Sequence, residues 1–370
     1  MRLHMLGLFY TIHAQSASVD AFSGKILRFP KMMKDEGFEI FEYGNEGSES
    51  IAQHKIPLLD RASFLELKGQ AQIEAPGHPH DTNSTLFKTF DMRLEEALAE
   101  RVQPGDIICH PLGPLHSRLM NSFPDCFHIE TGIGYSSIFA PYKVFESYAW
   151  WHWHQGLAER AGNNYEWVIP NYYDIDEWEP REAHGDYLLY FGRVIQNKGI
   201  EVVREIARHS GREVLICGEG KHAPWLSPEI PNLKFIPPVT GRARSDLLRN
   251  AYCALMPTLY TEPFGGSGVE AMLCGTPLLA SDFGAFSETV VQGFTGYRCK
   301  TLGDWLYGVK MASKLDRKAI AQFSRGKYCL EAIAPMYTRV FEQVAEMMNL
   351  GWYSHVPFMA IPPSDLFRRP

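Results

Sequence analysis

One stretch of the chain, residues 261–277, combines two carboxylates with a run of small residues. It reads TEPFGGSGVEAMLCGTP. Its glycine-rich part lies between an expected strand and an expected helix, so backbone N–H groups there can approach an anion. The partial positive charge of a helix N-terminus then favours a phosphate as the guest. The expected phosphate-binding turn consists of Gly265, Gly266, Ser267 and Gly268.

Glu262 and Glu270 flank this turn. A carboxylate accepts hydrogen bonds from two hydroxyl groups with little strain, which is how proteins commonly hold a sugar or a ribose. The pair therefore indicates a ligand rich in hydroxyl groups. For the segment taken alone, an acidic helix start is an equally good explanation.

A second loop, residues 191–199, reads FGRVIQNKG and follows an expected strand. From this loop Arg193 and Lys198 can converge on one diphosphate. Two solvated cations are the commoner explanation of such a loop alone. In an open α/β sheet, however, ligands gather at the carboxyl ends of the strands, where the Glu262 loop also lies. Together the two loops indicate a diphosphate site whose cations stabilise charge on a leaving group.

Three motifs together resemble the donor-binding domain of the retaining nucleotide-sugar glycosyltransferases of family four. Relatives in that family include glycogen synthase, sucrose-phosphate synthase and phosphatidylinositol mannosyltransferase. The motifs are Gly-Arg-x4-Lys at 192–198, Glu-x7-Glu at 262–270 and Ala-Met-x-Cys-Gly-Thr-Pro at 271–277. The resemblance covers residues 187–296. It implies the GT-B fold, in which two Rossmann-like α/β domains face a cleft and a C-terminal helix crosses back to the first domain.

The resemblance also implies roles for the matched residues. Arg193 and Lys198 would neutralise the donor pyrophosphate, and Glu262 would contact the transferred sugar. The implied donor-binding residues are Glu270 at the ribose, Phe264, Gly265, Gly266 and Ser267 at the sugar and phosphates, and Val239, within 238–240, at the base. The expected donor is a UDP- or GDP-sugar, with no permanently bound cofactor.

No metal is expected in this site. Asp174 and Asp176 form the nearest Asp-x-Asp pair, but they fall in the expected hinge and not at a strand end. Transfer is therefore expected to be metal-independent, and the resemblance to the family implies that it is retaining.

The first half of the chain resembles the family less closely. His13 and Ser16 follow the first expected strand, so they would face the cleft and meet the donor phosphate or the acceptor. A structural histidine explains His13 equally well. Glu130 stands where relatives often carry a cleft histidine, and there it can act as a general base or bind an acceptor hydroxyl.

Two weaker acceptor-binding candidates are His110, which ends an expected strand, and Glu146. Glu146 belongs to the aromatic-rich segment 144–154, which we expect to be helical with most rings in the core. His152 and His154 are not expected to form a metal pair, because residues two apart on a helix point away from each other. Arginines at 242, 244 and 249 are expected to be solvated.

The surrounding pattern predicts the elements that position these residues. In the second half, strands are expected at 187–191, 213–218, 233–236, 253–256 and 277–280, with helices at 199–209, 244–251, 268–274 and 287–292. In the first half, strands are expected at 3–9, 38–43, 106–110 and 126–130, with helices at 22–36 and 86–101. Residues 45–83 are expected to be a long loop or a small insertion.

This alternation predicts two doubly wound α/β domains, as does the chain length of 370 residues at roughly 150 residues per domain. The expected domains are 1–170, which binds the acceptor, and 171–340, which binds the nucleotide sugar. Residues 341–370 are expected to form a helix and tail that pack on the first domain. The hinge is expected at 169–174.

Composition narrows the class of protein. A net charge of -7 excludes a globally basic nucleic-acid coat. Seven scattered cysteines without a Cys-x-x-Cys pair argue against a disulfide framework and a zinc ribbon. No signal peptide or membrane span is expected, so the protein is predicted to be cytoplasmic, with no integral membrane contact.

The sequence leaves the acceptor open. A saccharide or another small hydroxyl compound is the first choice, and a hydroxylated base in DNA, as for glycosyltransferases of phages, is the alternative. A non-catalytic sugar-nucleotide binder and a nucleotide-sugar epimerase are rival functions on the same architecture. The intact Arg193, Lys198, Glu262 and Glu270 set argues against the binder.

Overall fold

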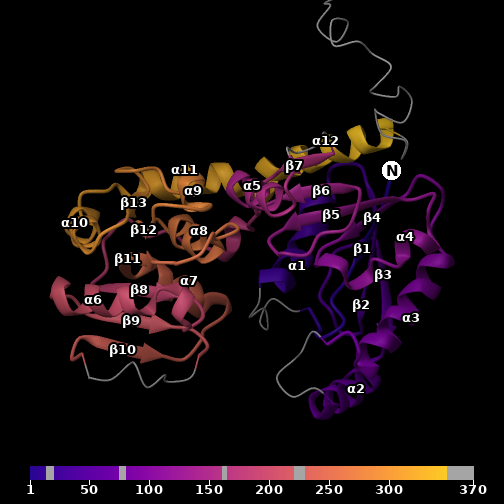
Figure 1. Ribbon diagram of the computed structural model, residues 1–370, viewed down its shortest axis with the longest axis horizontal. Helices are drawn as coiled ribbons and strands as arrows, with labels where there is room; N and C mark the ends of the chain where they lie inside the picture. Colours follow the sequence, from indigo (N-terminus) through magenta and orange to yellow (C-terminus); the bar gives the residue numbers. More distant parts are fainter. Residues whose placement is uncertain (14–20, 75–80, 161–164, 221–229, 348–370) are drawn as a thin grey trace, which may run out of the picture.

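The computed structural model describes residues 1–13, 21–74, 81–160, 165–220 and 230–347. Two parallel sheets flanked by helices lie side by side (Figure 1). Because helices cover the faces of parallel sheets, the inner strands are buried and form apolar runs, as in β4, β11 and β12. This is the two-domain α/β architecture predicted from the sequence.

The first sheet has the strand order β3-β2-β1-β4-β5-β6-β7. Its strands are β1 (Arg2–Leu6), β2 (Glu39–Asn45), β3 (His54–Leu59), β4 (Ile107–His110), β5 (Phe127–Ile133), β6 (Tyr142–Phe145) and β7 (Glu166–Val168). Its helices are α1 (Ala21–Met33), α2 (Arg61–Glu74), α3 (Thr85–Ala99), η2 (Gly113–His116), α4 (Leu119–Ser122) and α5 (Tyr148–Leu157).

The second sheet has the order β10-β9-β8-β11-β12-β13. Its strands are β8 (Tyr187–Phe191), β9 (Val214–Cys217), β10 (Leu233–Ile236), β11 (Ala251–Met256), β12 (Leu278–Ser281) and β13 (Gly296–Cys299). Its helices are η3 (Ile175–Glu177), η4 (Gln196–Lys198), α6 (Ile200–Ser210), α7 (Gly241–Arg249), α8 (Gly266–Leu273), α9 (Phe286–Thr289), α10 (Leu302–Ala312) and α11 (Arg317–Tyr328).

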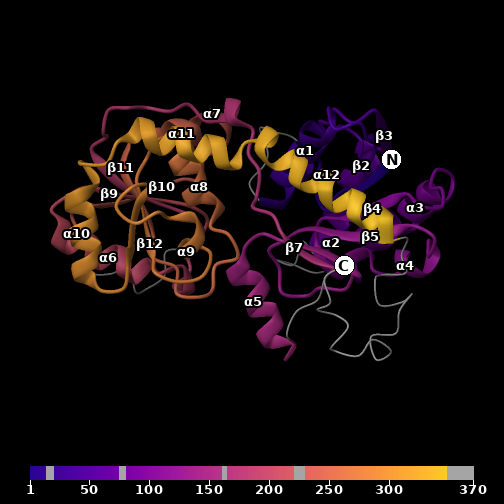
Figure 2. The same cartoon turned by 90° about the horizontal axis from the view of Figure 1, so that it is seen from above.

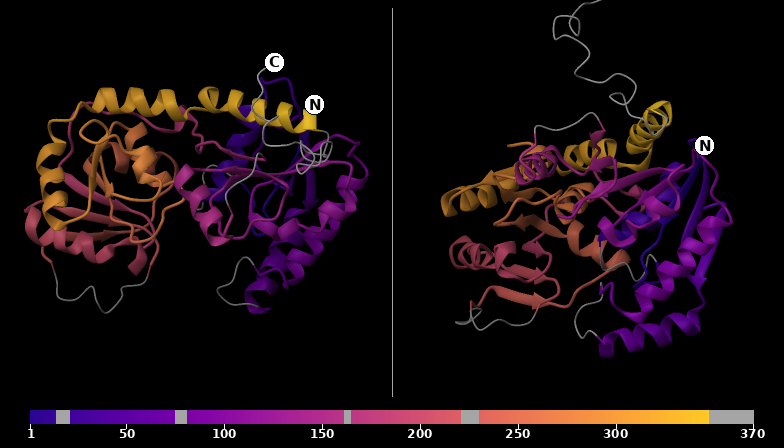
Figure 3. Two further views of the ribbon diagram at one scale, coloured as in Figure 1. Left: turned by 45° about the horizontal axis from the view of Figure 1, so that its top comes forward. Right: turned by 45° about the vertical axis from the view of Figure 1, so that its right-hand side comes forward.

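A long last helix, α12 (Leu330–Met347), runs from the second domain across the first (Figure 2), and a further view agrees (Figure 3). Its buried residues, from Leu330 to Val344, belong to the hydrophobic core of the first domain. Tyr337 packs edge-on against Phe29 of α1, with ring centroids 5.4 Å apart. Residues beyond Met347, including the expected C-terminal tail, lie outside the described part of the chain.

Of the two alternatives predicted for residues 45–83, a long loop or a small insertion, the long loop is wrong. β3 and α2 occupy most of this segment. β3 is the edge strand of its sheet, and it contains Pro57 and four residues that are at least partly exposed. Edge strands tolerate proline and polar residues, so the alternation that marks an ordinary strand is missing.

The prediction of one helix over residues 144–154 is also wrong at its start. Val144 and Phe145 end β6, and the helix begins only at Tyr148. Ser147 caps it, because its Oγ accepts a hydrogen bond from the N–H of Trp150 at 3.1 Å. The strand-to-helix boundary therefore falls between Phe145 and Tyr148.

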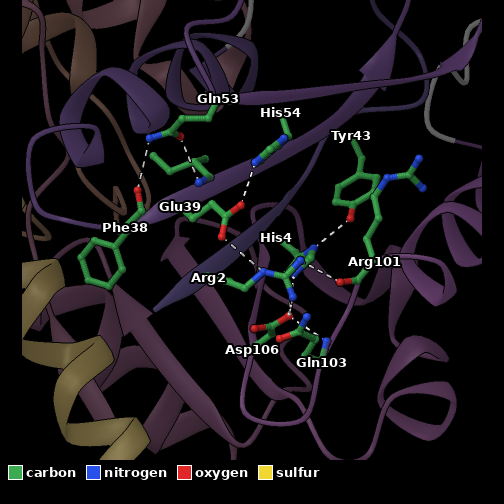
Figure 4. A network of polar contacts seen from close by, with 11 residues as sticks. Arg2, His4, Phe38, Glu39, Tyr43, Gln53, His54, Arg101, Gln103 and Asp106 are labelled. Atoms are coloured by element: carbon green, nitrogen blue, oxygen red, sulfur yellow. Dashed lines mark hydrogen bonds and ion pairs between the residues drawn. The ribbon is translucent and has the colours of Figure 1, made fainter.

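A buried polar network closes the amino-terminal edge of the first sheet (Figure 4). His4 on β1 joins Tyr43 Oη at 2.8 Å and Asp106 Oδ2 at 3.0 Å. Arg2 also donates to Asp106, at 3.0 Å. Burial lowers the pKa of His4, so the ring is held neutral against its acidic neighbour. This network lies at the opposite end of the strands from the site residues and ties β1, β2 and β4 together.

None of the seven cysteines forms a disulfide. Among the described residues, no helix is both long enough and apolar enough to cross a bilayer.

Candidate functional site

The strand order of the second sheet reverses between β8 and β11, and the loops after these two strands carry Lys198 and Glu262. Open α/β sheets bind their ligands at such a reversal. Gly199 allows the two loops to meet, because a Cβ on this residue, at φ +76°, would lie 1.8 Å from the carbonyl oxygen of Pro257. The N–H of Leu259 also donates to the carbonyl of Asn197, at 2.8 Å.

Lys198 and Glu262 form an ion pair across these loops, with Nζ and Oε2 2.5 Å apart. Their side chains are 13% and 10% exposed, so the pair is largely removed from water. Thr258 Oγ1 donates to the same carboxylate oxygen at 3.2 Å, and Lys198 Nζ lies 4.9 Å from the ring centre of Tyr260. Arg193 is exposed, and its charge opposes the rise in the pKa of Tyr260 that burial causes. Two cations, one carboxylate and one aromatic ring thus lie together where these loops meet. They belong to Arg193, Lys198, Glu262 and Tyr260.

The expected phosphate-binding turn forms the start of α8. Gly265 has φ +80°, and a Cβ there would lie 2.5 Å from the Phe286 ring. Gly268 is as tightly packed, because its Cβ would lie 2.6 Å from the side chain of Leu278. The first N–H groups of a helix have no partner within it, so Gly266 and Ser267, both partly exposed, present theirs at this end.

The side chain of Phe264 lies in the hydrophobic core and not at a ligand site. The ring is buried and packs edge-on against Tyr328, with centroids 5.8 Å apart. Its backbone amide precedes α8, so only the main chain is available to a ligand.

Glu270 is buried and forms an ion pair with Arg244 on α7. Burial raises the pKa of Glu270, and the charges of Arg244 and Arg28 oppose that rise. Arg244 also lies over the ring of Phe191, 4.8 Å from its centre. The prediction that Arg244 is solvated is therefore wrong. Its position in the first turn of α7, shortly after the partly buried Val239, is the signal that could have placed it in the site.

The first domain contacts this site directly. Ser147 Oγ donates to the carbonyl oxygen of Pro263, which follows Glu262, at 2.6 Å. Glu288 on α9 accepts hydrogen bonds from the first two N–H groups of α5, those of Tyr148 at 2.9 Å and Ala149 at 2.7 Å. A carboxylate at a helix N-terminus is favourable, so this contact holds the two domains together beside the Glu262 loop.

Two of the predicted first-domain residues serve the packing of their own loops. His13 is fully buried, and its Nε2 accepts a hydrogen bond from the N–H of Leu8 at 3.3 Å. Glu130 is also fully buried. Its carboxylate accepts hydrogen bonds from the N–H groups of Phe139 and Ala140, each at 2.9 Å, and from Tyr135 Oη at 3.1 Å. The catalytic roles of His13 and Glu130 stay predictions.

Glu146, at the end of β6, forms an ion pair with Lys25 of α1. Lys25 also donates to the carbonyl oxygen of Gly132 at 2.9 Å, so α1, β5 and β6 are joined beside Ser147. His110 is buried at the end of β4 and hydrogen-bonds to His128. Ser16 lies outside the described residues.

Within the described ranges, no group of three or more His, Cys, Asp or Glu side chains is arranged to hold a metal ion.

Residues 174–305 match the family model for glycosyl transferases group 1. The second domain is a group 1 glycosyltransferase domain. The chain is 32% identical over 183 residues to a glycogen synthase of Mycobacterium tuberculosis. The aligned segment covers 45% of this chain and 42% of that protein. The chain is 28% identical over 208 residues to the phosphatidyl-myo-inositol mannosyltransferase of the same species, 48% of this chain and 54% of that protein. The chain thus spans about half the length of the curated relatives it matches.

Solved structures resemble this chain over most of its length. AviGT4, involved in avilamycin A biosynthesis, has a TM-score of 0.65 at 16% identity and covers 93% of this chain and 98% of its own. Sucrose-phosphate synthase from Thermosynechococcus elongatus has the same TM-score and coverage at 15% identity. Anabaena HepE, solved with UDP and glucose, has a TM-score of 0.59 at 14% identity and covers 94% and 99%. The fold is GT-B, as the sequence predicts.

Proposed function

We propose that the chain transfers a sugar from a UDP- or GDP-sugar to an acceptor hydroxyl, with retention of configuration at C1. The observation that carries this proposal is the Lys198–Glu262 pair, which stands beside Arg193 at the strand reversal of the second sheet. A group 1 domain supports a nucleotide-sugar donor, and the HepE complex with UDP and glucose supports UDP as its nucleotide.

Arg193 and Lys198 serve the leaving group. When the bond from the sugar C1 to the phosphate oxygen breaks, negative charge develops on the diphosphate, and fixed cations stabilise that charge most in the transition state. The N-terminus of α8, beginning at Gly266, adds backbone N–H groups for the same anion. In this proposal these groups provide the positive charge that a metal ion provides in other transferases.

Glu262 holds the transferred sugar. It is fixed by Lys198 and Thr258, so it accepts sugar hydroxyls and does not attack C1. Retention then follows from attack on the same face that the phosphate leaves. The acceptor oxygen bonds to C1, the C1–phosphate bond breaks, and the acceptor proton moves to an oxygen of the departing diphosphate.

Glu270 and Arg244 form the ribose end of the donor site. The carboxylate of Glu270 receives the ribose hydroxyls, while the main chain around Val239 holds the base. Arg244, already paired with Glu270, opposes the rise in the pKa of Glu270 that burial causes.

The acceptor in this proposal is a saccharide or another small hydroxyl compound. It enters from the first domain, which the contact between Ser147 and Pro263 brings against the Glu262 loop.

A donor panel tests the proposal. Thermal shift with UDP-, GDP-, ADP- and dTDP-sugars should show stabilisation by one nucleotide class, because a ligand that binds only the native state raises its stability. The stabilising sugar nucleotide is then incubated with and without saccharides, with EDTA present, and the product anomer is read by NMR.

Release of the nucleoside diphosphate with a product of unchanged anomeric configuration is the expected result. Stabilisation without turnover would instead support a non-catalytic binder. Conversion of the donor sugar into its epimer without an acceptor would support an epimerase. Inverted product would refute the same-face mechanism.

A further inference from the structure

The first sheet also reverses its strand order, between β1 and β4, and a small hollow lies at the carboxyl ends of these two strands. Gly7 and Leu8, directly after β1, line one side, and His110 and His116 line the other. The hollow leaves about 10 Å³ for the centre of a water-sized group, which is room for one hydroxyl or one water. It therefore occupies the place in the first domain where this class of sheet binds a ligand.

The hydrogen bonds of His110 determine which of its ring nitrogens carries a proton. His128 Nε2 lies 3.0 Å from the carbonyl oxygen of Phe123, which can only accept, so this nitrogen is protonated. Burial lowers the pKa of His110 and of His128, so both rings are neutral at pH 7. His128 Nδ1 is then unprotonated and accepts a hydrogen bond from His110 Nε2 at 3.0 Å. His110 Nδ1 is left with a lone pair.

That lone pair is buried without a donor. His110 is 1% exposed, and within the described part of the chain its Nδ1 has no hydrogen-bond partner. The same holds for Nε2 of His116, whose Nδ1 is engaged with Asp91 Oδ1 at 2.6 Å. An unsatisfied buried polar atom costs free energy, which an incoming hydrogen-bond donor recovers.

The surroundings of His110 are rigid. Phe139 packs edge-on against its ring, with centroids 4.9 Å apart, and the N–H of Phe139 is held by Glu130. Buried Glu130 thus fixes the loop that forms a wall for His110. A side chain held in this way keeps its lone pair in one direction, which suits recognition of a single group.

The lone pair of His110, the small volume of the hollow and its apolar lining limit which chemical group it can bind. A lone pair attracts a hydroxyl or another donor and repels the oxygens of a carboxylate or phosphate. The available space limits the guest to one small group, and the apolar neighbours Leu8, Leu112 and Leu115 disfavour a strongly hydrated cation. A neutral hydroxyl fits all three conditions.

We propose that this hollow is an acceptor subsite, in which one hydroxyl of a neutral polyol donates a hydrogen bond to His110 Nδ1. The proposal rests on the function proposed above. His128 acts as a positioning residue, because its bond to His110 Nε2 keeps the receiving nitrogen unprotonated.

The first test is independent of turnover. NMR of the full chain labelled with ¹⁵N-histidine should show His110 Nδ1 as an unprotonated nitrogen, and its signal should move saturably when glycerol is added as the probe. The exposed His54 on β3 is the internal control and should not respond. In His128→Phe the Nδ1 signal should shift toward the protonated value without glycerol. A protonated Nδ1 in the unmodified protein, or no saturable response to glycerol, overturns the proposal.

The second test uses the acceptor that supports turnover in the donor panel. His110→Phe keeps a ring of similar size but removes the lone pair, so the KM for the acceptor should rise about tenfold. The KM for the donor should stay within about twofold of the unmodified value, as should both constants in the control His54→Phe. An unchanged acceptor KM in His110→Phe overturns the subsite. If the unmodified protein shows no turnover with any donor, the proposed function fails, and the NMR result still decides whether the hollow binds a hydroxyl.

Discussion

The buried ion pair of Lys198 and Glu262 can be probed by removing either partner or both. Breaking a buried pair leaves one charge without compensation, which commonly costs 3–5 kcal/mol. Because the two side chains are 13% and 10% exposed, we expect Lys198→Met or Glu262→Gln alone to cost about 3 kcal/mol in the free energy of unfolding. The double variant leaves no orphan charge, so its cost should be smaller than the sum by about 2 kcal/mol.

The coupling is measured by urea denaturation of all four proteins, followed by circular dichroism. The matched control is the pair Lys318–Glu182, whose atoms are 3.2 Å apart but whose side chains are 61% and 72% exposed. Its cycle of Lys318→Met and Glu182→Gln should give a coupling below about 0.5 kcal/mol. Additive effects at Lys198 and Glu262 would refute the pairing that the structure shows.

Activity should behave differently from stability in the same four proteins. If Lys198 and Glu262 contact the donor, each single variant should lose about 100-fold in kcat/KM, and the double variant should recover none of it although it recovers stability. Turnover that returns together with stability in the double variant would mean that the pair only holds the two loops together.

Three further predictions concern other parts of the molecule. Glu288→Ala removes the two hydrogen bonds at the start of α5 that join the domains. We expect kcat to fall about tenfold and small-angle X-ray scattering to show a larger radius of gyration. An unchanged radius of gyration would show that α9 does not hold the domains together. Burial raises the pKa of Glu42 from 4.5 to about 7. The free energy of unfolding therefore falls as the pH rises from 4.5 to 7, because the unfolded state loses this proton more readily than the native state. The stabilisation by Glu42→Gln in urea should therefore be near zero at pH 4 and reach about 3 kcal/mol above pH 8, with no such trend for the exposed control Glu66→Gln. Arg317 is buried and donates hydrogen bonds to three backbone carbonyls and one hydroxyl. Arg317→Met should therefore lower the Tm measured by calorimetry by about 10 °C. A decrease of less than about 3 °C would contradict this structural role.

Strands with both faces buried were predictable from the sequence because they carry continuous apolar runs. β8, which lies between β9 and β11 and has three buried central residues, was predicted at its observed bounds, Tyr187–Phe191. The edge strand β3 was not predicted, because Pro57 and its exposed residues break the apolar pattern. The boundary between β6 and α5 was also missed, since the aromatic residues on either side of Ser147 fit a strand as well as a helix.

The two loops of the candidate site, around Lys198 and Glu262, were singled out from short-range signals. Within each loop, the glycines that the turn requires and the charged residues lie within a few positions of one another, so their proximity inside that loop is set locally. Arg244 was predicted to be solvated because its partner, Glu270, lies 26 positions further along the chain. No local pattern reports an ion pair of that separation.

The amino-acid sequence by itself determined the parallel α/β architecture and the turn at Gly265, because periodic apolar runs and obligatory glycines act over neighbouring residues. Tertiary structure alone decided which ionisable groups are paired and which are not. It joins Lys198 to Glu262 across 64 positions and Ser147 to Pro263 across 116, and it brings His110 beside Gly7 and Leu8 at the end of β1. Those arrangements depend on how two sheets order their strands and meet each other, which is a property of the packed chain and not of any segment within it.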